Sequence, residues 1–191
     1  MKPKERCGWL NLNNELYVSY HDHEWGVPVH DDQKLFEMLI LEGAQAGLSW
    51  ETILKKRDNY RDAFDRFDVD KVALYDDEKI ASLLLDEGIV RNRLKVTSAV
   101  TNARIFKMIQ DEYGSFDRYL WGFVNNTPVV NKFEVLSEVP AKTELSDQIS
   151  KDLKKRGMKF VGSTIIYAYM QAIGMVNDHT LNCFRHEEVK L

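Results

Sequence analysis

The chain has 191 residues, of which 44% are hydrophobic and 29% charged, and its formal net charge at pH 7 is -4. This length is enough for one well-packed core and short for two, so we expect a single domain over residues 1–191. The slightly acidic net charge excludes a nucleic-acid-binding protein that is basic over its whole surface. No apolar run is long enough to cross a membrane, so no membrane partner is expected.

The first ten residues, MKPKERCGWL, lack the apolar stretch and the cleavage site of a signal peptide. We therefore expect a cytoplasmic protein. The two cysteines, Cys7 and Cys183, stand at opposite ends of the chain. A reducing compartment disfavours a disulfide between them, which leaves free, catalytic or metal-ligating roles.

Apolar residues recur at helical spacing along most of the chain, and most of these stretches end at glycine or asparagine. The pattern predicts helices over 31–47, 49–64, 76–88, 91–114, 115–124, 143–157 and 161–174. No stretch shows a convincing strand alternation, so the fold class expected is all-α. Residues 125–144 form the one long irregular connection.

The first of these predicted helices carries an acidic residue on its apolar stripe. Glu42 follows Leu35 by seven residues and Met38 by four, so a helix places its carboxylate on the same face as both. An ionised group in apolar surroundings is costly unless it is paired. Two interpretations stay open: a functional carboxylate in a pocket, or a helix-end residue bonded to a neighbouring tyrosine or arginine.

Aromatic residues are concentrated in the same part of the sequence. Trp9, Trp25 and Trp50 lie within the first 50 residues, and Tyr20 directly precedes His21. Each of them taken singly is explained by an ordinary core position. Their density around one carboxylate favours an aromatic pocket.

Basic residues cluster between 151 and 159, where five cationic side chains accompany a single acid, Asp152. Gly157 and Gly162 follow, and Ser163 begins the next predicted helix. Such a corner leaves backbone N–H groups at a helix N-terminus, an arrangement that binds phosphate. The ordinary alternative is a packing corner beside a solvated basic face.

Near the C-terminus, His179 precedes Cys183 by four residues. If the segment from Asp178 forms one helical turn, both side chains project from the same face and offer two metal ligands. Cys7 and His21 supply a second pair, and two cysteines with two histidines fit a closed, structural zinc site. Rival histidines are His23, His30 and His186, and each of the four residues also has an ordinary non-ligating interpretation.

Several segments, in order and over nearly the whole chain, resemble the type I 3-methyladenine DNA glycosylases of bacteria. They are ERCGW, YHDHEWG, LFEMLILEGAQAGLSW, GIVRNRLK and LKKRGMKFVGSTIIYAYMQAIGMVNDH, followed by Cys183. The resemblance implies a compact helix-hairpin-helix glycosylase fold, with the hairpin in 151–174. It also implies one structural zinc that joins segments 1–30 and 175–191 through Cys7, His21, His179 and Cys183.

The resemblance further implies the activity: a monofunctional glycosylase of base excision repair that flips out and hydrolytically excises 3-methyladenine, leaving an abasic site. The expected partners are alkylated double-stranded DNA and the free base, and the expected state is a monomer. Glu42 would bond the edge of the base, in a pocket lined by Tyr20, Trp50, Trp9 and Trp25. The implied DNA-binding residues are Lys155, Arg156, Gly157, Lys159, Gly162 and Ser163.

Two other functions are compatible with parts of the sequence. One is a non-catalytic, zinc-containing module that recognises DNA damage. The other is a metal hydrolase built on YHDHEWG, which lacks a second cluster of metal-binding side chains. Asp178 directly precedes a predicted zinc ligand, and we expect it to support that ligand or to cap the segment.

Overall fold

The structure is a computed structural model that describes residues 4–189. The predicted terminal segments therefore include residues 1–3, 190 and 191, which lie outside the described part. The elements in chain order are α1 (Glu15–His23), α2 (Asp32–Gln45), α3 (Trp50–Ala63), η1 (Asp65–Phe67), α4 (Val69–Ala73), α5 (Asp77–Leu83), α6 (Arg93–Tyr113), α7 (Phe116–Gly122), β1 (Val129–Val130), η2 (Leu136–Glu138), α8 (Glu144–Lys155), α9 (Ser163–Ala172), β2 (Val176–Asn177) and α10 (Arg185–Glu188).

The all-α prediction is confirmed, and each predicted helix is present. The N-terminal caps include Asp31, Ser49 and Asn92, whose side chains accept from backbone N–H groups of the first helical turn. The connection over 125–144 is irregular as expected, apart from β1 and η2. β1 pairs in parallel with β2, which is a two-residue contact too short to show as an alternating pattern.

Three short helices were not predicted: α1, α4 and α10. The expected helical turn from Asp178 to Cys183 is wrong, because this segment follows β2 as irregular backbone and turns. Its backbone folds back on itself, and the Cys183 N–H donates to the Thr180 carbonyl. The two candidate ligands of this segment approach each other through that turn.

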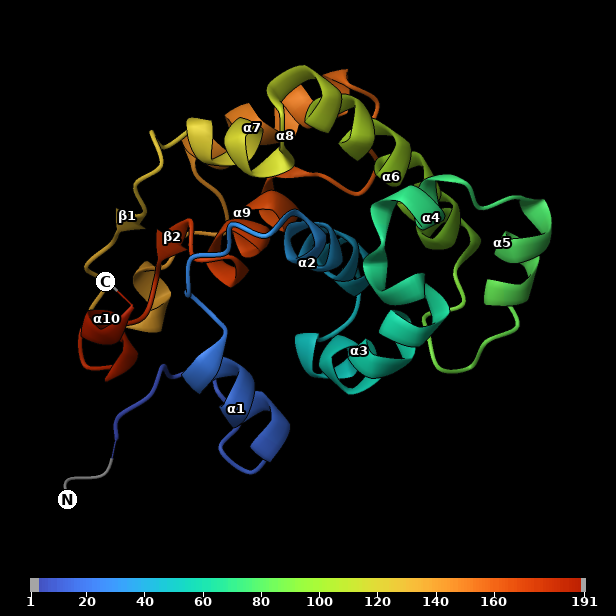
Figure 1. Cartoon of the computed structure of the whole chain (residues 1–191). Helices are drawn as coiled ribbons and strands as arrows, with labels where there is room; N and C mark the ends of the chain where they lie inside the picture. Colours follow the sequence, from blue (N-terminus) through green and yellow to red (C-terminus); the bar gives the residue numbers. More distant parts are fainter. Residues whose placement is uncertain (1–3, 190–191) are drawn as a thin grey trace.

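Helix α2 lies in the middle of the molecule and packs against α9, α3 and α6 (Figure 1). Its residues from Leu35 to Ala44 are all buried, which explains the long apolar run in the sequence. The Tyr169 hydroxyl of α9 donates to the Leu35 carbonyl, and Lys95 of α6 donates to the carbonyls of Ala44 and Ala46. Helix α2 is thus fixed at both ends by its neighbours.

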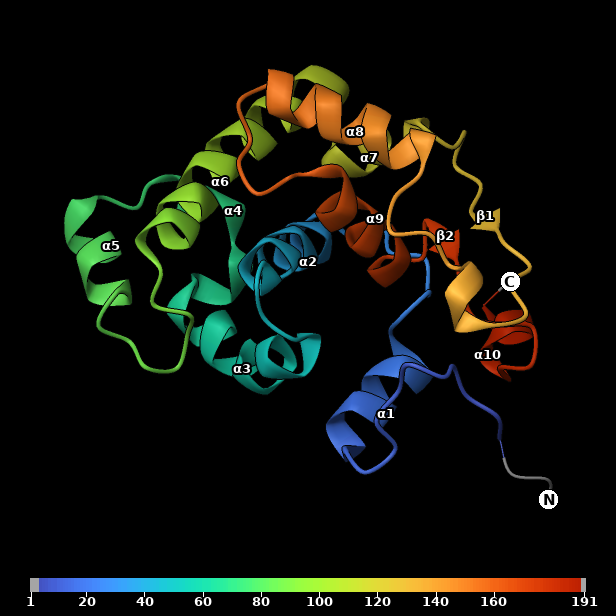
Figure 2. The same cartoon turned by 180° about the vertical axis from the view of Figure 1, so that it is seen from behind.

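The loop over residues 156–162 makes the corner between α8 and α9, and the two helices pack against each other (Figure 2). Gly157 has a φ of 102° and Phe160 a φ of 54°, both in the left-handed region. The Asn102 side chain of α6 bonds both the N–H and the carbonyl of Lys159, and Ser150 donates to the Val161 carbonyl. These bonds hold the corner against α6.

The two ends of the described chain lie together, because the Phe184 N–H donates to the Glu5 carbonyl.

The backbone at Val27 and Pro28 packs closely against Gly174, which has a φ of 70°. A Cβ at Gly174 would lie 2.3 Å from the Val27 carbonyl carbon. In the part of the chain described, no helix is both long and apolar enough to cross a membrane.

Gly174→Ala tests this close approach. The new methyl group meets backbone that cannot rotate away, and the left-handed φ adds strain, so we expect a loss of about 2–4 kcal/mol in the free energy of unfolding. Gly122→Ala is the control, since a Cβ at Gly122 has no atom within 4 Å. Urea denaturation measures both variants. Equal stabilities of the two would contradict the proposed close approach.

Candidate active site and metal centre

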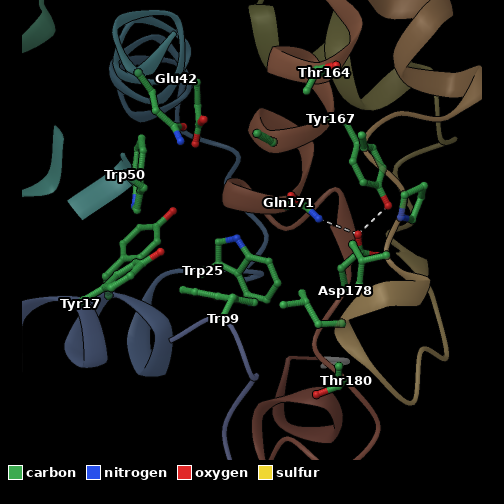
Figure 3. Close-up of a pocket in the computed structure, with 17 residues that line it drawn as sticks. Trp9, Tyr17, Trp25, Glu42, Trp50, Thr164, Tyr167, Gln171, Asp178 and Thr180 are labelled. Atoms are coloured by element: carbon green, nitrogen blue, oxygen red, sulfur yellow. Dashed lines mark hydrogen bonds between the residues drawn. The ribbon is translucent and has the colours of Figure 1, made fainter. Parts of the chain in front are cut away.

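A cavity of about 480 Å³ opens between α1, the C-terminal half of α2, α9 and the segment from Leu136 to Ala141. Figure 3 shows the side chains that line it. All five residues predicted for a base site are among them: Trp9, Tyr20, Trp25, Glu42 and Trp50. The fold therefore brings the predicted carboxylate and aromatic residues to one concave surface.

The Glu42 side chain is buried, with 4% of the residue exposed. No hydrogen bond or ion pair joins its carboxylate to another residue between 4 and 189. Burial raises the pKa of Glu42 from 4.5 to about 8. The helix end beside it is held instead by Lys95, which bonds the carbonyls of Ala44 and Ala46. Glu42 is therefore an unpaired acid facing a cavity.

Aromatic rings form the wall beside Glu42. Tyr20 and Trp50 lie with ring centroids 5.4 Å apart, and Trp9 and Trp25 lie 5.0 Å apart. The Trp50 Nε1 is buried and has no hydrogen-bond partner among the described residues. A buried donor without a partner is costly, and a ligand in the cavity would relieve that cost.

Helix α1 supplies two tyrosines to this wall, of which Tyr17 was not predicted. Tyr17 and Tyr20 stand three residues apart on one helix face, and both line the cavity. Asn11 and Asn14 donate to Glu51, which fastens this helix to α3. The sequence of α1 is rich in weak helix formers, so this face was not recognised.

A buried arginine fixes the helices behind the cavity. Arg57 of α3 donates to Glu37 of α2 and, through both terminal nitrogens, to Glu24 at the end of α1. In the sequence, Arg57 belongs to a short basic cluster over 54–57. Its side chain is 6% exposed, so this member of the cluster is structural.

The predicted metal ligands also come together. The ligand atoms of Cys7, His21, His179 and Cys183 all lie within 4.8 Å of one another, and all four residues are buried. His179 Nδ1 lies 3.4 Å from Cys7 Sγ and 3.5 Å from Cys183 Sγ. Sulfur and nitrogen ligands of tetrahedral zinc, at about 2.3 and 2.05 Å from the metal, lie about 3.6 Å apart. The donor set and its spacing fit such an ion.

The remaining nitrogens of both histidines are held by other groups. His21 Nδ1 lies 2.8 Å from Asp22, and His179 Nε2 lies 3.0 Å from the Trp25 carbonyl. Burial alone would raise the pKa of Asp22, but hydrogen bonds with Arg6 and His21 outweigh it and hold the pKa at about 2. Such outer contacts orient the rings of ligating histidines.

The three rival histidines lie outside this group. His23 bonds the Ser19 carbonyl, His30 pairs with Asp117, and His186 contacts the Asn131 carbonyl. The four predicted ligands are the set that the described chain assembles.

The predicted phosphate-binding corner lies at the start of α9, beside the cavity. Gly162 caps α9 without a side-chain bond, and Ser163 Oγ lies 2.8 Å from Ser146 Oγ. Lys155 and Lys159 are exposed. Arg156 is different, because its guanidinium is committed to Glu112 and Asp152 and lies over the rings of Tyr113 and Tyr119.

Comparison with known proteins identifies the family. Residues 9–186 match the model of a family described as methyladenine glycosylase. The chain belongs to this family. It is 51% identical over 179 residues to the DNA-3-methyladenine glycosylase 1 of Escherichia coli, covering 94% of this chain and 95% of that protein. A Haemophilus influenzae DNA-3-methyladenine glycosylase is 46% identical, with coverages of 93% and 96%.

Solved structures agree with the sequence comparison. A crystal structure of a 3-methyladenine DNA glycosylase I has a TM-score of 0.90 at 47% identity and covers 94% of this chain and 98% of that one. A structure of the Staphylococcus aureus 3-methyladenine DNA glycosylase I, which concerns recognition of 3-methyladenine, has a TM-score of 0.91 at 37% identity. The match covers 94% of this chain and 95% of that one. The family resemblance read from the sequence is confirmed.

The raised pKa of Glu42 predicts a pH-dependent stability. A folded-state pKa above 4.5 means that protonation stabilises the folded protein; this contribution is complete below about pH 4.5 and is lost as the pH rises through about 8. Glu42→Gln removes it. Melting temperatures from about pH 5 to pH 9 should show the variant gaining stability relative to the parent protein. A difference that stays constant with pH would contradict the raised pKa.

Proposed function

We propose that this chain is a monofunctional DNA glycosylase, acting as a single domain over 1–191 in the cytoplasm and as a monomer. It flips an alkylated nucleotide out of double-stranded DNA and excises 3-methyladenine by hydrolysis. The observation that carries the proposal is the unpaired, buried carboxylate of Glu42 in an aromatic cavity. The relatives named above as 3-methyladenine glycosylases support the same activity.

The cavity suits a cationic purine. Methylation at N3 gives the adenine a positive charge, and aromatic faces attract a cation by about 0.5–2 kcal/mol each. Trp50 and Tyr20 provide such faces, and Glu42 provides a hydrogen-bond acceptor for the edge of the base. Neutral adenine gains less from both contacts, so charge contributes to the choice of base.

Glu42 changes its protonation state as the cavity fills. With a pKa of about 8 in the ligand-free cavity, it is mostly protonated at neutral pH. A cationic base nearby favours the ionised form, because opposite charges stabilise each other at low dielectric. The leaving base departs neutral, so the carboxylate stabilises the cationic reactant without having to transfer a proton.

Zinc at Cys7, His21, His179 and Cys183 is part of the proposal. Four protein ligands leave no open position, so the ion would supply stability and no chemistry on the base. The residues of this site join the N-terminal segment to the segment after β2. The proposed role of the ion is structural, and its site lies next to the cavity.

The corner between α8 and α9 is the proposed DNA anchor and corresponds to the hairpin of a helix-hairpin-helix protein. The start of α9 presents backbone N–H groups at Ser163 and its neighbours, and Lys155 and Lys159 add positive charge. Gly157, with its left-handed φ, lets the chain turn there, and Gly162 is the residue that caps α9. Arg156 stabilises the corner through its ion pairs with Glu112 and Asp152.

Release of bases from methylated DNA tests the activity directly. The parent protein should release free 3-methyladenine, whereas a non-catalytic recognition module would bind the DNA and release nothing. Glu42→Gln should weaken binding of free 3-methyladenine by about 1.5–3 kcal/mol and slow excision, because the carboxylate, which is ionised when it accepts a hydrogen bond from the bound base, is replaced by a neutral amide. Glu37→Gln is the matched control: this glutamate is also buried on α2 but bonds Arg57 outside the cavity. It should lose stability and keep its excision rate per folded molecule.

Metal analysis of the purified protein should find one zinc per chain. Cys183→Ser should lose the metal and lower the free energy of unfolding by several kcal/mol, since metal binding is coupled to folding. His23→Ala, which removes an exposed rival histidine, should keep both the metal and the free energy of unfolding of the parent protein. Folded parent protein without metal would contradict the zinc proposal and leave the base-release result unaffected.

Lys155→Ala combined with Lys159→Ala should weaken DNA binding for all sequences. The slope of log affinity against log salt is negative, and each lost phosphate contact should make it less steep by about 0.9. Lys71→Ala with Lys79→Ala, on α4 and α5, serves as a control of equal charge. Equal salt slopes for both double variants would place the DNA elsewhere, with the basic residues over 91–95 as the next candidates.

A further inference from the structure

The turn between α2 and α3 forms the rim of the cavity on the side of the proposed DNA anchor. A second hollow, of about 200 Å³, lies between this turn and the start of α9. The two hollows share four lining residues: Glu42, Gln45, Thr164 and Ala168. Glu42 and Thr164 stand at the same end of the cavity in Figure 3. A nucleotide that leaves DNA anchored at the α8–α9 corner would therefore pass between the turn and α9.

This turn has few bonds to the rest of the molecule. The Ala46 N–H donates back to the Gly43 carbonyl of α2, and Ser49 bonds Thr52 of α3. For residues 44–49, hydrogen bonds to any other part of the described chain come from one side chain. Lys95 of α6 donates through Nζ to the Ala44 carbonyl at 2.8 Å and to the Ala46 carbonyl at 2.6 Å. The place of the turn thus depends on this lysine.

Lys95 belongs to the basic residues over 91–95 but differs from its neighbours. Arg91 and Arg93 are exposed, whereas Lys95 is half-buried. No acidic residue between 4 and 189 forms an ion pair with Lys95, and burial lowers the pKa of its ammonium group. The last carbonyls of a helix have no partner within the helix and carry partial negative charge, so a cation is favourable there. The ammonium group is directed to the end of α2 and away from DNA phosphates.

Helix α6 also holds the opposite side of the passage. Asn102 follows Lys95 by seven residues, about two helical turns, and its side chain bonds the N–H and the carbonyl of Lys159 at the α8–α9 corner. The corner also packs on α2, since a Cβ added at Gly43 would lie 3.2 Å from the Phe160 Cβ. One helix therefore sets the distance between the turn after α2 and the start of α9.

Resting on the proposed glycosylase function, we infer that Lys95 is a positioning residue for excision: its bonds to the turn fix the passage through which the flipped nucleotide enters. Lys95 lines neither hollow, so it acts through the turn and not on the substrate. Without its bonds the turn moves, and a small displacement at the edge of a site slows a reaction by misplacing the substrate. Glu42 and Trp50 belong to α2 and α3 themselves, so the base site keeps its residues in place.

A purely structural role for Lys95 predicts different behaviour. Loss of a lysine–carbonyl bond would then lower stability and leave excision per folded molecule unchanged. Lys56 of α3 is the matched control. It is also half-buried, its Nζ donates to the Glu87 carbonyl at 2.8 Å, and it lines neither hollow.

The first experiment compares Lys95→Met with Lys56→Met in the full chain. Lys95→Met should slow single-turnover excision of 3-methyladenine from methylated DNA on the order of tenfold per folded molecule. Its affinity for the free base should stay within about twofold of the parent value, because a small molecule does not need the passage to be held in one shape. Lys56→Met should match the parent protein in both measurements.

Excision by Lys95→Met at the parent rate would overturn the inference. Equal losses in excision and in free-base affinity would overturn it as well, because they would place the defect in the base site. A parent protein that releases no base would contradict the proposed function instead.

The second experiment separates the turn from a phosphate contact. Lys95→Met should bind DNA with the same slope of log affinity against log salt as the parent protein, whereas a slope less steep by about 0.9 would make Lys95 a phosphate contact and overturn the inference.

A third measurement needs only the parent protein, bound to duplex DNA with a tetrahydrofuran abasic site. NMR follows the ammonium protons of Lys95, assigned through its own side chain. Because two carbonyls accept from this group, its protons should exchange with water at least about tenfold more slowly than those of the exposed Lys71. Exchange as fast as in Lys71 would overturn the inference even if Lys95→Met failed to fold.

Discussion

The contact on which the site depends is the one that joins the two ends of the chain. Cys7 and His21 meet His179 and Cys183 in one buried cluster. Tyr20 and Asp178, each one residue from a member of this cluster, line the cavity. The rings of Trp9 and His21 lie 5.3 Å apart, and those of Trp25 and His179 lie 4.6 Å apart. The cluster and the cavity therefore share a wall, so whatever fixes the cluster also fixes the cavity.

The rest of the fold allows Glu42 to stay unpaired. Helix α2 is held at its C-terminal end by Lys95 and on its flank by Arg57, so its stability does not require a bond to Glu42. Each of these cations meets oxygen atoms away from the cavity. The acid at the cavity wall is thus free to meet a cationic ligand, at the cost of a raised pKa in the ligand-free state. Function and stability are served by different residues of one helix.

Much of this could be predicted from the sequence, because helix caps, apolar spacing and residue type are local signals. Glu42 stood out as an acid on an apolar stripe, and the cysteines and histidines by their chemistry. Other features depend on contacts between distant residues. Helix α1 gains its place from Asn11 and Asn14 binding Glu51, and the segment from Leu136 to Ala141 has no periodicity to mark it as a cavity wall. The donors to Asp178 come from two distant segments, α9 and the residues after β1, so its setting was also invisible in the sequence.

The central claim is that the fold keeps an unpaired acid ready for a cationic base. The most direct test is the carboxyl ¹³C resonance of Glu42, assigned with Glu42→Gln and followed over pH by NMR. The ligand-free protein should show a titration midpoint of about 8, and the midpoint should fall when 3-methyladenine saturates the cavity, because the neutral base donates a hydrogen bond to the ionised carboxylate. A midpoint near the ordinary value of 4.5, unaffected by the base, would contradict the account.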